Sequence, residues 1–420
     1  MAAPLGSNYW KLWTSSALSN LADGVMKVAL PLVAIRYTDS PTIIAGLAFA
    51  FSLPWLVFAL TAGALADRFD RRRLMLVANS ARAAFLAVLT IAAAMGAGSI
   101  WILYAAALCV GIAETIYDTS SQSILPQVVS RSALSRANGR LYAAELTANQ
   151  FVGPPLGGFL VAAGFALAFG APVLLWALAI GMLLLMRGSY GTDHPRTTTM
   201  RADIAEGLRF LWSNTLLRVL AIMVGVFNFA GNATFTVLVL YAVGPASAMG
   251  LTDPGYGLLL TASALGSVLG SLVAERVEHG LGRSRALILT ILGSFVSLAT
   301  PAFTTNPYIV GAGFFLGGIT VSIWNVITVS LRQRITPTRL LGRLNSAYRL
   351  VSWGTIPLGA LAGGVLAQFL GFPPVFIIMG ALTLGLVIGM IWVTDRRMDQ
   401  AEHDAESVSA EHDAARSAGR

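Results

Sequence analysis

Twelve stretches of this chain are long and apolar enough to cross a lipid bilayer. They cover residues 10–37, 43–66, 74–96, 100–124, 135–163, 166–187, 216–243, 255–276, 285–303, 307–331, 343–370 and 373–394. One crossing needs about 20 mostly apolar residues, and lipid favours helices because their backbone polar groups are satisfied within the segment. Only 11% of the residues are charged, against about 25% in soluble proteins. The sequence therefore predicts an all-α membrane protein with twelve transmembrane helices.

Basic residues are distributed unevenly between these stretches. Almost all of the 28 Lys and Arg residues lie at the N-terminus, in the even-numbered connections or at the C-terminus. Arg36 beside an odd-numbered connection and Lys27 inside the first span are the exceptions. Because positive charge marks the cytoplasmic side, we expect a multi-pass protein of the cell membrane with both termini in the cytoplasm. The net charge of +8 then reflects topology and lipid headgroups, and we expect no nucleic-acid partner.

The chain contains an internal repeat of about half its length. Tyr142 and Gly158 have identical counterparts 206 positions later, at Tyr348 and Gly364. Repeats of this kind are typical of transporters, whose substrate site lies between the two halves near the midplane of the membrane. The predicted architecture is two pseudo-symmetric six-helix bundles, residues 1–187 and 216–394.

Two polar segments flank these bundles. Residues 188–215 form a predicted cytoplasmic linker, in which Ile204, Leu208 and Leu211 fall on one face of an amphipathic helix at the membrane interface. Residues 395–420 form a polar tail, predicted to be a solvated helix or disordered.

A basic motif lies in the connection between the second and third spans. The segment Gly63-Ala-Leu-Ala-Asp67-Arg68-Phe-Asp70-Arg71-Arg72-Arg73 resembles the loop 2–3 signature of the major facilitator superfamily, and its form is similar to the branch of enterobactin exporters and macrolide efflux proteins. The resemblance implies the major facilitator fold and a gating role for Gly63, Asp67, Arg68, Arg71 and Arg72. Asp70 stands where the family often has Gly. The alternative interpretation is a generic basic inner loop.

A second motif lies in the fifth span. Gly153, Pro154, Gly157 and Gly158 resemble the Gly-Pro-x-x-Gly-Gly antiporter signature of the same family, which favours export. Asn149 replaces the glycine expected upstream. A proline kink that serves packing alone is the alternative. The fourth span lacks the Arg that many drug:proton antiporters carry, so proton coupling cannot be inferred from that residue.

Ionisable residues inside spans are costly, and each is a functional candidate by default. Asp23 and Lys27 share a face of the first span, as either a structural ion pair or part of a proton-coupling site. Glu145 in the fifth span is the best single candidate for proton coupling, with a polar packing role as the alternative. Arg349 is a candidate partner for Glu145 or for an anionic substrate group.

Two further acids, Glu114 and Asp118, share a face of the fourth span. Two close carboxylates in a low dielectric resist being ionised together, so one of them is a candidate proton carrier. Arg82 in the third span lies at a similar depth and could neutralise one of them, which would make the group structural.

Polar and aromatic side chains complete the predicted substrate cavity, which suits a large amphiphilic ligand. The candidates are Asn20, Trp55, Gln150, Asn228, Asn232, Trp324, Asn325, Tyr348, Arg349 and Trp353. Each of them could instead be a packing residue or an interfacial anchor.

Together these features predict a monomeric secondary transporter that exports a hydrophobic or amphiphilic small molecule, such as a drug, macrolide or siderophore, in exchange for protons. A proton-coupled uptake symporter on the same fold is one alternative, and a membrane receptor or enzyme without transport is another. The sequence has no phosphate-binding Gly-x-x-x-x-Gly-Lys-Ser/Thr motif, no nucleophile arrangement and no metal-ligand cluster. We therefore expect no enzyme activity, no cofactor and no metal, with the proton gradient as the energy source and the lipid bilayer as the surroundings.

Overall fold

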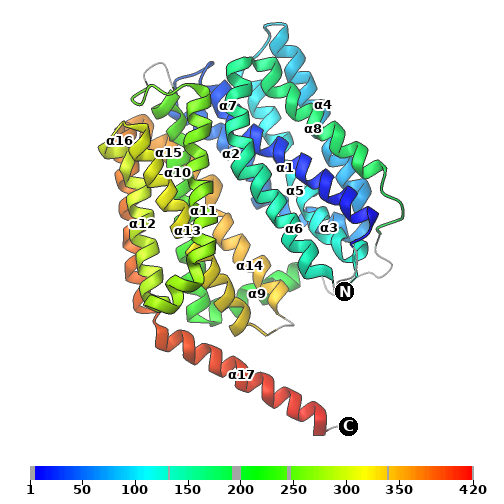
Figure 1. Ribbon diagram of the computed structural model, residues 1–420, viewed down its shortest axis with the longest axis vertical. Helices are drawn as coiled ribbons and strands as arrows, with labels where there is room; N and C mark the ends of the chain where they lie inside the picture. Colours follow the sequence, from blue (N-terminus) through cyan, green and yellow to red (C-terminus); the bar gives the residue numbers. More distant parts are fainter. Residues whose placement is uncertain (1–4, 131–132, 192–199, 244–246, 338–339, 419–420) are drawn as a thin grey trace. The chain divides into compact units, whose positions relative to one another are not determined.

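In the computed structural model, residues 5–130, 133–191, 200–243, 247–337 and 340–418 are described. Every regular element in these ranges is helical (Figure 1). Ten helical segments are long and apolar enough to cross a membrane. They are α1 (Ser7–Ala34), α4 (Arg71–Ala94), α5 (Ile100–Val128), α8 (Phe165–Leu184), α10 (Thr215–Val243), α11 (Asp253–Leu281), α12 (Arg283–Phe303), α13 (Pro307–Ile335), α14 with α15 (Leu341–Trp353 and Thr355–Leu370), and α16 with η3 (Phe372–Leu384 and Gly385–Ile391).

The two remaining predicted crossings coincide with helices that are broken. The stretch 43–66 is divided into α2 (Pro41–Val57) and α3 (Ala59–Arg68), just after Pro54. The stretch 135–163 is divided into α6 (Leu134–Leu146), the π-helix η2 (Thr147–Val152) and α7 (Gly153–Ala163). Pro54 lies inside α2 and Pro154 lies in the first turn of α7, so each crossing lacks a backbone N–H donor close to its division. The prediction of an all-α membrane protein is confirmed.

The predicted repeat is visible in the local structure. Helices α6 and α14 each contain 13 residues, and each ends where a second helix of the same predicted crossing takes over. In the first repeat the break is a π-helical turn, and in the second it is the single residue Gly354.

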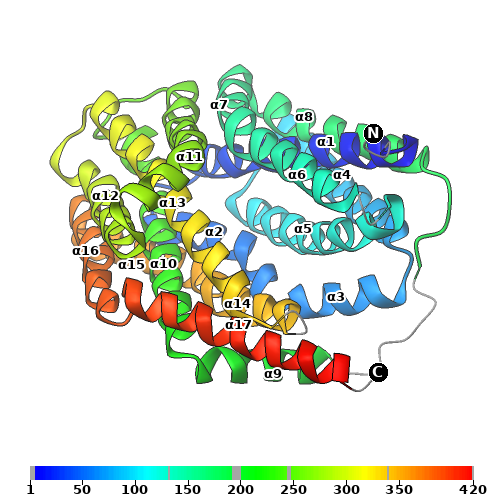
Figure 2. The same cartoon turned by 60° about the horizontal axis from the view of Figure 1, so that its bottom comes forward.

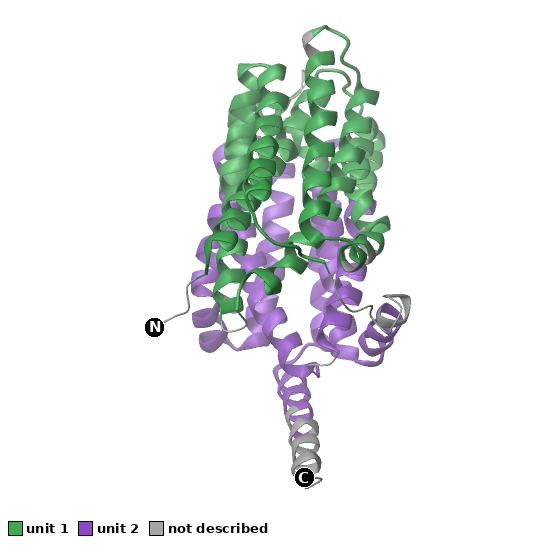
Figure 3. Ribbon diagram, turned by 90° about the vertical axis from the view of Figure 1, so that its right-hand side faces the viewer, with its two compact units in different colours: residues 1–197, 235–261, 360–371 green, residues 198–234, 262–359, 372–420 purple. Residues whose placement is uncertain are grey.

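The chain forms two compact units (Figure 3). Unit 1 contains residues 1–197, 235–261 and 360–371, and unit 2 contains residues 198–234, 262–359 and 372–420. Within unit 1, α1 lies beside α6 and α8 (Figure 2). These units are defined by contacts and not by chain order, so the predicted bundle boundaries at 187, 215 and 394 stay a prediction.

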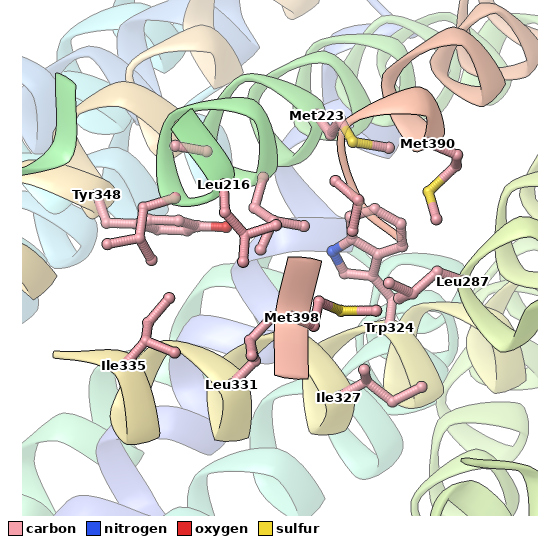
Figure 4. Close-up of a cluster of buried hydrophobic side chains, with 14 of the residues drawn as sticks. Leu216, Met223, Leu287, Trp324, Ile327, Leu331, Ile335, Tyr348, Met390 and Met398 are labelled. Carbon is pink, nitrogen blue, oxygen red and sulfur yellow. The ribbon is translucent and has the colours of Figure 1, made fainter. Parts of the chain in front are cut away.

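Unit 2 has a hydrophobic core to which α17 (Asp395–Ala418) contributes. Figure 4 shows Met398 of α17 among the side chains of this core, close to Trp324 of α13. Arg283 at the start of α12 holds α17 through Glu402, at 2.6 Å, and Asp399, at 2.5 Å. The tail is therefore helical, which is one of the two states predicted for it, and its first turns pack against the core of unit 2.

The predicted amphipathic helix of the linker is α9 (Met200–Ser213). It packs along α14, where Gly207 meets the backbone of Arg343 and Glu206 forms an ion pair with the Arg343 side chain. Its Leu211 is fully buried, whereas half of Trp212 is exposed. The location of α9 at a membrane interface stays a prediction.

Candidate functional site

The candidate site is built around Arg82, a fully buried arginine of α4 in unit 1. Its guanidinium lies between the rings of Tyr117 and Trp176, at 5.4 and 5.5 Å from their centroids. Its Nη1 is 3.3 Å from the carboxylate of Asp23 on α1 and donates to the hydroxyl of Ser19 at 3.1 Å. Asp23 is buried as well, so the ion pair is shielded from water. Removing one partner of such a pair would leave an uncompensated buried charge.

Two further carboxyl groups, Glu114 and Asp118, lie within electrostatic reach of this pair, and Glu145 lies within reach of Asp118. The charge of Glu114 is within electrostatic reach of Asp23, and Asp118 interacts with Glu114, Asp23, Arg82 and Glu145. Glu114 is buried and its Oε2 has no hydrogen-bond partner among the described residues. Asp118 is partly buried and Glu145 is exposed. The four predicted proton-coupling residues therefore belong to one electrostatic cluster, with burial increasing from Glu145 through Asp118 to Glu114.

Lys27 does not pair with Asp23. Its Nζ donates to Oδ1 of Asn149 at 2.6 Å. Nδ2 of Asn149 is 3.4 Å from Oδ1 of Asn20, whose own Nδ2 donates to the Ser16 carbonyl at 2.9 Å. The direct contacts are therefore Arg82–Asp23 and Lys27–Asn149, whereas the structural alternatives had been an ion pair of Lys27 with Asp23 and one of Arg82 with an acid of the fourth span. Asn149, which takes the place of an expected glycine, is part of this hydrogen-bonded chain.

The antiporter-like motif brings α7 against α1. A Cβ added at Gly153 would lie 2.6 Å from Cα of Gly24, and one added at Gly157 would lie 2.8 Å from the carbonyl oxygen of Val25. Only glycine permits this approach of two backbones. The preceding turn is η2, and π-helical turns frequently occur at functional sites. The crossing therefore fixes Asn149 beside α1.

The last glycine of the motif, Gly158, lies against α11 and not α1. A Cβ there would lie 3.0 Å from Cα of Pro254 and closer still to the carbonyl oxygen of Asp253. Gly257 on α11 meets the backbone of Pro154 in the same way. Gly364, the repeat counterpart of Gly158, meets the backbone of Pro41 at the start of α2. The two repeats thus provide two equivalent glycine crossings, both in unit 1.

Polar contacts reinforce these crossings. Nη2 of Arg36 is 2.8 Å from Oδ2 of Asp253, whose side chain is nearly buried. Ser40 donates to Gln368 at 3.1 Å. Sequence reasoning did not select Asp253, although Arg36 stood out as the basic residue beside an odd-numbered connection, and that was the available signal.

The basic motif between α3 and α4 is held by backbone contacts. Asp70 accepts from the backbone N–H of Arg73 at 3.0 Å and of Tyr190 at 2.8 Å, so it caps α4. Burial alone would raise the pKa of Asp70, but these hydrogen bonds outweigh it and the pKa lies below its usual value. Arg71 donates to the Ala66 carbonyl at 3.2 Å, and Arg72 donates to the Leu183 carbonyl at 2.7 Å.

The other residues predicted for gating differ in how far the structure describes them. Gly63 is buried and Arg68 is exposed, and the side chain of Asp67 lies outside the described residues. The gating role of the motif stays a prediction.

The predicted cavity residues are spread over both units. In unit 1, Asn20 is buried, Trp55 is partly buried and Gln150 is exposed. In unit 2, Asn228 and Asn232 are partly buried and Asn325 is exposed. Asn228 donates to the Ser352 carbonyl, 2.7 Å away, just before the break between α14 and α15. It thereby satisfies backbone polarity at a helix end.

The aromatic candidates of unit 2 divide into two groups. Trp324 and Tyr348 belong to the hydrophobic core, which differs from the expected place along a cavity wall (Figure 4). Trp324 packs edge-on against Phe227, with ring centroids 5.1 Å apart. Arg349 stacks on the exposed ring of Trp353 at 4.2 Å. Of the three aromatic candidates in unit 2, Trp353 is therefore the one whose ring is exposed.

Comparison with known proteins places the chain among membrane transporters. Residues 1–417 match the family described as transmembrane secretion effector. The multidrug efflux pump Tap of Mycolicibacterium fortuitum is 27% identical over 389 residues, which cover 87% of this chain and 91% of Tap. An uncharacterised transporter of the major facilitator type from Bacillus subtilis is also 27% identical, over 96% of this chain and 97% of its own length.

Solved structures resemble the fold at lower identity. The nucleoside transporter NupG has a TM-score of 0.71 at 12% identity, over 92% of this chain and 98% of its own. A bacterial homologue of the iron transporter ferroportin also has a TM-score of 0.71, at 16% identity, over 91% of this chain and 98% of its own. The predicted fold class is confirmed. These relatives are transporters and not enzymes, and the chain belongs to the transmembrane secretion effector family of the major facilitator superfamily.

Proposed function

We propose that this protein exports amphiphilic small molecules across the cytoplasmic membrane in exchange for protons. It acts as a monomer with both termini in the cytoplasm, and rocks residues 1–187 against residues 216–394. The efflux function of Tap, which covers most of this chain at low identity, supports the direction. Gly158 of the antiporter-like motif and Gly257 of α11, at the α7–α11 crossing, support a mechanism in which that crossing must open once in each cycle.

The acid cluster in unit 1 is the observation that supports proton coupling. Asp23, Glu114, Asp118 and Glu145 outnumber the two cations near them, Arg82 and Lys27. Excess negative charge inside a membrane protein is stabilised by binding protons. Because such groups titrate as a set, the proton belongs to the cluster and not to a single residue.

Burial suggests the order in which a proton moves. Glu145 is exposed and Asp118 is partly buried. Glu114 is buried, with one oxygen lacking a partner among the described residues. In the proposed route a proton enters the cluster at the exposed Glu145 and is shared with the more buried carboxyls beside the Arg82–Asp23 pair.

Everted membrane vesicles provide the test. A pH gradient, acid inside, should drive accumulation of a fluorescent amphiphile such as rhodamine B by the wild-type protein. Glu114→Gln and Asp118→Asn should abolish accumulation against a gradient but still allow the dye to equilibrate. Asp404→Asn, at an exposed acid of α17, is the matched control and should behave as wild type.

Two outcomes would contradict this proposal. Full gradient-driven accumulation by Glu145→Gln, Glu114→Gln and Asp118→Asn, at matched expression, would remove proton coupling from the cluster. Accumulation only in right-side-out vesicles with acid outside would show uptake by symport, the alternative on the same fold.

A further inference from the structure

Lys27 is a charged side chain in the C-terminal half of α1, the most buried of the candidate spans. The most apolar window of α1 is 72% buried, the largest share among the ten candidate spans found in the described residues. Between residues 22 and 30, all of which are described, Lys27 is the only exposed residue. An ammonium group at such a depth is costly in hydrocarbon, so it faces a polar or water-accessible space or a bound anion.

Lys27 lies within electrostatic reach of Asp23 but forms no ion pair with it. Asp23, one turn earlier on α1, is engaged by Arg82 on α4. Among the ion pairs of the described residues, none includes Lys27, and its hydrogen bond goes to the neutral amide of Asn149. An ammonium has three N–H donors, and this contact uses one of them.

The direction of the hydrogen bonds fixes Lys27 in place. The Ser16 carbonyl accepts from Asn20, and Oδ1 of Asn20 faces the amide nitrogen of Asn149, which leaves Oδ1 of Asn149 for Lys27. The close crossing at Gly24 holds the backbone of Asn149 against α1. The ammonium is therefore held in advance of binding, which lowers the entropic cost of capturing a ligand.

We propose that Lys27 binds the anionic group of the transported molecule, so that the protein selects amphiphiles that carry a carboxylate or another single negative charge. This proposal rests on the proposed transport of amphiphiles and adds that these molecules carry a negative charge. A single ammonium matches a monoanion. Because a charge-assisted hydrogen bond is strong in a low dielectric, a ligand with a free carboxylate should bind more tightly than the same ligand with an esterified one.

Equilibrium binding to the full-length protein in lipid nanodiscs tests this inference without a gradient. Rhodamine B and its ethyl ester are matched probes, because they differ only in the free carboxylate. The wild-type protein should bind the acid about 10- to 100-fold more tightly than the ester, the range expected for a hydrogen bond to a charged group. Lys27→Gln should lose this preference with unchanged affinity for the ester, and Lys27→Arg should keep most of it.

Amine labelling gives a second readout, because the chain contains only two lysines, Lys11 and Lys27. In a Lys11→Arg background, rhodamine B should slow the reaction of Lys27 with trinitrobenzenesulfonate, located by mass spectrometry, and the ester should not. Lys11→Gln is the control for binding, since Lys11 donates to the Leu185 carbonyl near the end of α8 and lies about four helical turns before Lys27 on α1.

The outcomes separate this inference from the proposed function. Equal affinity of the wild-type protein for acid and ester, or an acid preference that survives in Lys27→Gln, would overturn the role of Lys27 even if vesicles export both dyes. An acid preference lost in Lys27→Gln would support it, even if vesicles show no proton-driven accumulation and the proposed export fails.

Discussion

A single methyl group at Gly158 should disfavour the arrangement of α7 and α11 described above. In Gly158→Ala the new Cβ would lie 3.0 Å from the carbonyl carbon of Asp253 and from Cα of Pro254. Both atoms are backbone, so no side chain can rotate away to relieve the contact. Gly257→Ala would place a Cβ 3.0 Å from Cα of Pro155, on the other side of the same crossing.

The expected cost follows from how far the two helices must separate. Ordinary carbon contacts lie at about 3.5–4.0 Å, so the backbones would have to move apart by about 0.5–1 Å. Overpacking of this size costs about 1–3 kcal/mol, which corresponds to a change of about 5- to 150-fold in the ratio of two conformations. Because both substitutions open one crossing, the double variant should cost less than the sum of the two single variants.

If both glycine crossings of unit 1 open together in the proposed cycle, spin labels on α2 and α15 can measure this ratio. Thr42 and Gln368 lie within hydrogen-bond distance, at 3.5 Å, so labels placed there report the packed state as a short distance. The single cysteine, Cys109, is first replaced by serine. Double electron–electron resonance should show a smaller population of short distances in Gly158→Ala and Gly257→Ala than in the wild-type protein. The population of longer distances should rise correspondingly.

Gly170→Ala is the control, because a Cβ at that helical glycine would meet nothing within 4 Å. It should leave the distance distribution unchanged. An unchanged distribution in Gly158→Ala, with the protein folded and labelled, would refute the view that this crossing sets the conformational balance. Strict additivity in the double variant would refute the shared origin of the two costs.

Three further predictions concern polar contacts. Asp70→Ala should lower thermal stability at pH 7 by about 1 kcal/mol, as for a lost helix cap; since the folded pKa of Asp70 is depressed, the difference from wild type should shrink as pH falls below about 4, and a constant difference would contradict it. Arg283→Ala should speed hydrogen exchange in α17 about 5-fold, as expected for the loss of about 1 kcal/mol, and unchanged exchange would argue against docking by this residue. Arg36→Ala should reduce the short-distance spin-label population because it strands the nearly buried Asp253, and adding Asp253→Asn should restore it; failure of that rescue would exclude the ion pair as the cause.

Hydropathy predicted most of the fold because lipid leaves few choices to an apolar chain. The predicted crossing 307–331, for example, lies within α13, which starts at Pro307 and ends at Ile335. The divisions within crossings were harder to foresee, since the π-helical turn at Thr147–Val152 depends on its packing against α1. The docking of α17 was missed because one buried side chain, Met398, is inconspicuous in a polar sequence.

The candidate site shows a similar division. Spacing along one helix correctly grouped Glu114 with Asp118, because residues four apart share a face. That reasoning could not identify partners on other helices, because Arg82 and Asp23 are 59 positions apart in the sequence and Lys27 and Asn149 are 122 positions apart. Only the tertiary structure, in which Arg82 of α4 reaches α1 and η2 packs against α1, decides which cation meets which acceptor.

The crossings of unit 1 also carry information about assembly during biosynthesis. Arg36 meets a residue 217 positions later, and Ser40 meets one 328 positions later. Contacts of such long range close the largest loops in the chain and are slow to form. They therefore join only after the local hairpins of the early helices have inserted. Contacts that form late are expected to open more readily than the local core of each helix pair, which suits the proposed opening and closing of these crossings in each transport cycle.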